Sequence, residues 1–176
     1  MTLSALQHII RAAQALAEDR TILVLGFASL LASFPELGNA ESPLASTYDA
    51  DLCPEPFDEL TGTMLDEALG ENRAYYQRHG YHADILRDTI LQTLPSGWRG
   101  RLVSVPGCAA AYALDPHDLA AVKLLVGRPK DINLLVHLHA AALINAEVVR
   151  SRMNLLDIPV ESVPRLHSNF RDVFRA

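Results

Sequence analysis

Apolar residues recur at spacings of three and four in the first part of the chain. They are Leu3, Leu6, Ile9, Ile10, Ala13, Leu16 and Ala17. Residues three and four apart lie on the same face of an α-helix, so this pattern predicts an amphipathic helix over residues 3–18. We interpret it as a helix that packs its apolar face on a core.

A different pattern follows at Thr21–Leu25, where β-branched and aliphatic residues stand next to one another and end at Gly26. A short apolar run of this kind predicts a buried strand, and the residues after the glycine predict a helix over 27–34. Proline, glycine and asparagine residues then predict a surface loop over 35–46. We expect a second strand at 48–52.

Pro54 and Pro56 are expected to end that strand, because proline cannot donate a hydrogen bond to a neighbouring strand. Beyond them the pattern predicts further helices and strands. Helices are expected at 57–69 and 71–78, strands at 81–86, 101–105 and 109–114, and helices at 116–126, 130–142 and 146–155, with Pro159 and Pro164 breaking up the tail. This order predicts an α+β fold: a small mixed β-sheet flanked by helices, with a helical C-terminal third.

Composition predicts one globular domain over residues 1–176, since 49% of the residues are hydrophobic and 20% are charged. The chain lacks an apolar run that could cross a bilayer, and polar residues interrupt residues 1–19 in a way that a signal peptide does not allow. We therefore expect a cytoplasmic protein without a membrane partner. The two cysteines have no ligand spacing and receive no chemical role.

A net charge of −6 argues against a protein that binds nucleic acid over its whole surface, because neutralising phosphates requires clustered Lys and Arg residues. A local basic site stays open. Lys123 and Lys130, the only lysines of the chain, stand seven residues apart with Arg128 between them.

The strongest chemical signal is the pair Asp49 and Asp51 in the second expected strand. Side chains of a strand alternate between its two faces, so two aspartates one residue apart project to the same side and can share a divalent cation. Carboxylate oxygens suit Mg²⁺, which takes its other ligands from water and from substrate phosphates. The alternative is that this short acidic pair only ends a strand and solvates a turn.

Other residues would complete such a site. Gly26 allows the backbone to approach a phosphate, and the helix that follows directs its N–H groups, with Ser29, toward it. Asp84 is the candidate third carboxylate and metal ligand. His82, two residues earlier, could be a base or a metal ligand, but we interpret it as a partly buried structural histidine.

The order of strand, glycine turn, helix and Asp-x-Asp strand resembles the nucleotidyltransferase superfamily of polymerase beta-like proteins. Within it, the chain is similar to a largely uncharacterised bacterial family related to abortive-infection toxins. Three later blocks carry this second resemblance: Leu94–Leu102, Leu114–Leu124 and Gly127–Asp131. With them the resemblance covers a core of about residues 20–140, followed by a helical C-terminal extension of about 141–176.

The resemblance implies a Mg²⁺-dependent enzyme that moves a nucleotide from a nucleoside triphosphate to a hydroxyl of an RNA, protein or small-molecule acceptor. By position it assigns Lys123, Lys130 and Asp131 to the active site, with Lys123 among the catalytic groups. Arg128 joins them as a nucleotide-binding candidate. For Arg128, Lys130 and Asp131 an ordinary salt bridge in an interhelix turn is an equal alternative, and Asp131 could cap a helix.

One departure favours a different function. The turn reads Gly26-Phe27-Ala28-Ser29, where the superfamily usually has a second small residue after the glycine. The alternative is a catalytically inactive module of the same fold that binds a regulatory, toxin–antitoxin or defence partner. The long apolar helices leave a homodimer open.

Overall fold

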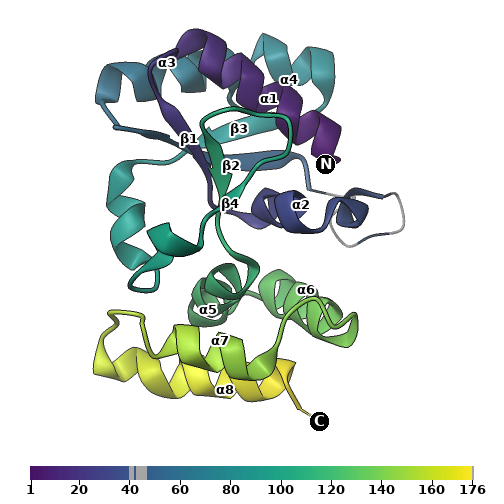
Figure 1. Ribbon diagram of the computed structural model, residues 1–176, viewed down its shortest axis with the longest axis vertical. Helices are drawn as coiled ribbons and strands as arrows, with labels where there is room; N and C mark the ends of the chain where they lie inside the picture. Colours follow the sequence, from purple (N-terminus) through teal and green to yellow (C-terminus); the bar gives the residue numbers. More distant parts are fainter. Residues whose placement is uncertain (40–41, 43–46, 176) are drawn as a thin grey trace. The chain divides into compact units, whose positions relative to one another are not determined.

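The computed structural model describes residues 1–39, 42 and 47–175 of the chain. These residues form two compact units (Figure 1). Unit 1 comprises residues 1–92 and 101–115, and unit 2 comprises residues 93–100 and 116–176, of which the last is not described. The helices of unit 2 begin at Pro116, where a helix over 116–126 was predicted, so the boundary between the units falls inside the core of about 20–140 that the resemblance covers. A single domain over 1–176 stays a prediction.

Unit 1 is built on one mixed five-stranded sheet with the strand order β3-β2-β1-β5-β4. The strands are β1 (Thr21–Val24), β2 (Asp49–Glu55), β3 (His82–Ile85), β4 (Val103–Ser104) and β5 (Ala111–Ala113). β2 pairs in parallel with β3 and antiparallel with β1, which in turn pairs in parallel with β5. The edge strand β3 therefore lies directly beside the strand that carries the acidic pair.

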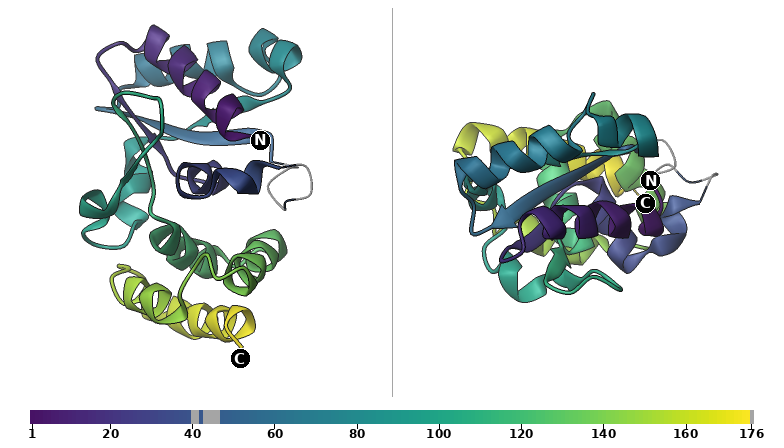
Figure 2. Two further views of the ribbon diagram at one scale, coloured as in Figure 1. Left: turned by 45° about the vertical axis from the view of Figure 1, so that its right-hand side comes forward. Right: turned by 90° about the horizontal axis from the view of Figure 1, so that it is seen from above.

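Helices cover both faces of this sheet (Figures 1 and 2). On one face lie α1 (Leu3–Leu16), α3 (Glu59–Leu69) and α4 (Ala74–His79). On the other, a 3₁₀ turn, η1 (Phe27–Ser29), leads from β1 into α2 (Leu30–Ser33), and η1 contacts β2. A further 3₁₀ turn, η2, spans Pro35–Gly38.

The core of unit 1 joins the apolar stripe of α1 to the strands. Leu6, Ile9 and Ile10 of α1 are fully buried, as are Ile22 and Leu52 of the sheet. Burying side chains of this size removes a large apolar area from water, which stabilises the helix on the sheet. The prediction of a packing helix at the N-terminus is confirmed.

The predicted end of β2 is wrong, since the strand continues to Glu55 through Pro54. In the antiparallel ladder, Leu25 N donates to Asp51 O at 3.0 Å, and hydrogen-bonded pairs alternate with non-hydrogen-bonded ones. Pro54, opposite Ile22, therefore falls in a non-hydrogen-bonded pair. Its missing N–H breaks no bond to β1, so the proline does not end the strand.

Unit 2 is a small helical bundle. It contains α5 (Pro116–Val126), α6 (Pro129–Ala140), α7 (Ala146–Met153) and α8 (Val163–Val173). A 3₁₀ turn, η5 (Val160–Ser162), directly precedes α8. α5 packs against the other three helices, and α6 packs against α8. Inside the bundle, Arg152 Nε lies 3.2 Å from Oδ1 of the fully buried Asp118.

Pro164 does not break up the tail as predicted. It stands in the first turn of α8, where the amide it lacks would have no partner within the helix, so the helix runs on to Val173. Two 3₁₀ turns, η3 (Asp88–Thr93) and η4 (Trp98–Arg101), complete the described elements.

The predicted α+β class, the mixed sheet and the helical C-terminal third are confirmed. Most expected elements are present within a few residues of their predicted bounds. The loop expected over 35–46 begins with η2, and residues 40–41 and 43–46 lie outside the described part. Among the helices of the described residues, none is both long and apolar enough to cross a membrane.

Candidate functional site

Three aspartates meet on β2 and β3. Asp49 and Asp51 project from one face of β2, and Asp84 is the direct partner of Asp51 on the parallel neighbour β3. Each carboxylate offers one oxygen, and these three oxygens lie within 4.8 Å of one another. Strand alternation predicted from the sequence that Asp49 and Asp51 share a face. The pairing of β2 with β3 brings Asp84 beside them.

Gly26 provides the room for one of these carboxylates. It follows the last residue of β1 by two positions and packs so closely on β2 that an added Cβ would lie 1.6 Å from Asp51 Oδ2 and 2.5 Å from its Cγ. No side chain larger than hydrogen fits there without moving Asp51. Gly26 therefore lies directly against the acidic pair, and its contact with a phosphate stays a prediction.

The electrostatics of the triad suit a cation. Burial raises the pKa of the Asp84 carboxyl above its ordinary value, and the negative charges of Asp49 and Glu71 add to this, whereas His82 opposes it. Crowded carboxylates repel one another, and a divalent cation among them would relieve the repulsion. Three hard carboxylate oxygens at this spacing fit Mg²⁺ or Mn²⁺ by their chemistry.

Ser29, a predicted phosphate contact, is buried in the structure. It lies on η1, directly before α2, and is fully buried, and its Oγ has no hydrogen-bond partner within the described residues. Its backbone N–H donates to Gly26 O at 2.9 Å. In this conformation Ser29 supports the turn and does not present its hydroxyl to a ligand.

The predicted basic residues belong to unit 2. Lys123 is half-buried on α5, and Lys130 is exposed in the first turn of α6. Arg128 precedes α6 and forms a two-bond ion pair with the fully buried Asp131, with Nε to Oδ2 at 2.8 Å and Nη2 to Oδ1 at 3.1 Å. Asp131 also accepts the backbone N–H of Arg128 at 3.3 Å. The structural alternative for this pair, a salt bridge that caps a helix, describes what is present.

Sequence reasoning gave no site role to His82, although it lies beside the triad. Its side chain is 10% exposed, and its Nε2 lies 3.3 Å from Asp84 Oδ1. Tyr76 of α4 packs edge-on against the imidazole with ring centroids 5.1 Å apart. The spacing His82-x-Asp84 on one strand was a usable signal, because residues two apart on a strand share a face.

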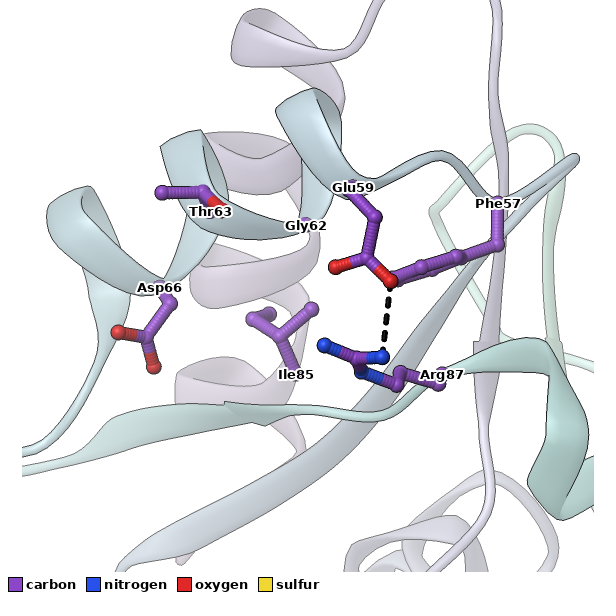
Figure 3. A pocket seen from close by; sticks show the side chains of 7 residues that line it. All are labelled: Phe57, Glu59, Gly62, Thr63, Asp66, Ile85 and Arg87. Carbon is purple, nitrogen blue, oxygen red and sulfur yellow. Dashed lines mark ion pairs between the residues drawn. The ribbon is translucent and has the colours of Figure 1, made fainter.

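A cavity of about 210 Å³ lies between α3 and the end of β3 (Figure 3), on the face of β3 that does not carry Asp84. Ile85 lines it, and Ile85 and Asp84 are consecutive strand residues that point to opposite faces. Arg87 pairs with Glu59 across this cavity at 2.9 Å, with both side chains 67% exposed. An exposed pair of this kind contributes little, and the cavity is separate from the acidic triad.

Comparisons of this chain with protein-family models, with curated proteins and with solved structures gave no match. The fold and the site define an α+β protein with a cluster of three aspartates that could bind a metal ion. The resemblance to nucleotidyltransferases stays a prediction from the sequence.

Proposed function

We propose that this protein binds a nucleoside triphosphate with Mg²⁺ and transfers a nucleotide to a hydroxyl of an RNA, protein or small-molecule acceptor. The observation that supports this most is the arrangement of Asp49, Asp51 and Asp84, whose oxygens lie within 4.8 Å of one another beside the glycine turn that follows β1. Nucleotidyl transfer depends mainly on positioning and on neutralising phosphate charge, which a carboxylate-held cation can provide.

In this proposal Asp49, Asp51 and Asp84 hold the cation. When bound, the metal would neutralise charge on the triphosphate and polarise its phosphorus–oxygen bonds. One carboxylate oxygen of the triad would take the proton of the acceptor hydroxyl, since no other base is assigned to the site. The backbone at Gly26 would lie next to the phosphates.

The test is calorimetric titration of each nucleoside triphosphate, with and without Mg²⁺, into the full chain and into the doubly substituted Asp49→Asn, Asp51→Asn protein. We expect Mg²⁺-dependent binding that the double substitution abolishes while the unfolding temperature is kept. Asn preserves the shape of Asp and removes its charge, so a loss of binding reports on cation coordination. Absence of nucleotide binding by the wild type would refute the proposal.

A second candidate is a catalytically inactive module that binds a regulatory, toxin–antitoxin or defence partner. The burial of the Ser29 hydroxyl favours it, because a fully buried group is not accessible to a phosphate, and so does the bulky Phe27 in the turn. The occupation of both Asp131 oxygens by Arg128 points the same way. Biological function that survives both Asp49→Asn and Asp51→Asn would support this candidate over metal chemistry.

A further inference from the structure

We propose that His82 is a positioning residue of the acidic triad: through its Nε2–H it holds the Asp84 carboxylate in the orientation that meets Asp49 and Asp51. The inference rests on the proposed function in one respect, which is that the triad binds a divalent cation. It adds a fourth residue to the site, one that acts through a ligand and does not itself bind the metal.

The position of His82 follows from strand register. It stands opposite Asp49 in the parallel pairing of β3 with β2, and two residues before Asp84 on the same face of β3. Its Nε2 lies 3.3 Å from Asp84 Oδ1. The imidazole thus lies on the same face of the sheet as all three carboxylates.

The imidazole is held in one orientation. Its side chain is nine-tenths buried, and Tyr76 packs against its ring from α4. The other ring nitrogen, Nδ1, is buried and has no hydrogen-bond partner within the described residues. A buried N–H without an acceptor is costly, so the proton of the neutral ring belongs on Nε2, where Asp84 can accept it.

Asp84 needs such support more than the other two aspartates. It lies on the edge strand β3, its side chain is 50% exposed, and Asp49 and Glu71 repel its charge. Without a partner, the carboxylate would be hydrated better and repelled less if it rotated toward solvent and away from the cluster. Supporting residues of this kind typically contribute about 10- to 100-fold to metal affinity.

Two substitutions separate the role of Nε2 from the packing of the ring. The amide nitrogen of His82→Gln reaches about as far as Nε2, whereas that of His82→Asn reaches only as far as Nδ1. Both remove the ring and its contact with Tyr76. We expect His82→Asn to bind Mn²⁺ about 10- to 100-fold more weakly in calorimetry, and His82→Gln to bind close to the wild-type affinity, with similar metal-free unfolding temperatures.

A double-substitution cycle with Asp84→Asn completes the test. His82→Asn should add no further loss of Mn²⁺ affinity in the Asp84→Asn background, because the carboxylate it positions is gone. Two results would overturn the positioning role alone, provided that the wild type binds Mn²⁺. The first is an equal loss of Mn²⁺ affinity in His82→Gln and His82→Asn, and the second is additive losses of affinity in the cycle. No Mn²⁺ binding by the wild type would overturn the proposed function as well.

Discussion

Gly26→Ala offers a direct test of how the turn after β1 shapes the acidic triad. The added methyl group would lie 1.6 Å from Asp51 Oδ2, 2.5 Å from Cγ and 3.0 Å from Cβ. The carboxylate is the movable part of this contact, since β1 and β2 are fixed by their ladder. To restore an ordinary separation of non-bonded atoms, the nearer oxygen must move by about 2 Å.

A displacement of this size exceeds what a metal site tolerates, which is about 0.5 Å for its ligating groups. We therefore expect Gly26→Ala to weaken Mn²⁺ binding by at least about 10- to 100-fold, the loss typical when only a supporting residue is removed. The overpacking should also lower the free energy of unfolding by about 1–3 kcal/mol. Calorimetry measures the first effect and chemical denaturation the second.

Gly100→Ala is the matched control, because a Cβ at that position meets nothing within 4 Å. It makes the same chemical change and should leave Mn²⁺ affinity unaltered. Equal Mn²⁺ affinity in Gly26→Ala and Gly100→Ala would refute the reasoning, since it would mean that Asp51 need not occupy the space above the glycine for the metal to bind.

Three further predictions concern stability. Asn145→Ala should cost about 1 kcal/mol, since Asn145 Oδ1 accepts two backbone N–H groups at the start of α7; an unchanged denaturation midpoint would contradict this. Arg128→Ala should cost about 1–3 kcal/mol by leaving the buried Asp131 without its ion pair, whereas a solvated, purely ligand-binding arginine would be lost without cost to the free energy of unfolding. The pKa of Asp58 lies below its ordinary 3.8 because Thr61 donates to it and Arg20 pairs with it. Its contribution is therefore present above about pH 4 and lost as acid protonates the folded carboxyl, so the stability gap to Asp58→Asn should close on acidification in denaturant titrations; a gap independent of pH would exclude the effect.

The sequence predicted those parts of the fold that depend on local periodicity. The stripe of apolar residues predicted α1, and the helix predicted at 116–126 has the bounds of α5, Pro116–Val126. Its errors were errors of context. Pro54 continues a strand because its position in the ladder requires no N–H, and Pro164 opens a helix because it stands in the first turn.

For the candidate site, the sequence by itself determined that Asp49 and Asp51 share one face, since strand alternation is a property of the local backbone. Only the tertiary structure decided that Asp84 and His82 join them, because the parallel pairing of β2 with β3 brings together residues more than thirty positions apart. The contact of Gly26 with Asp51 likewise depends on the packing of β1 against β2. Local spacing fixes the direction in which a side chain points, whereas the neighbour it meets depends on strand order and register, which arise only when the sheet assembles.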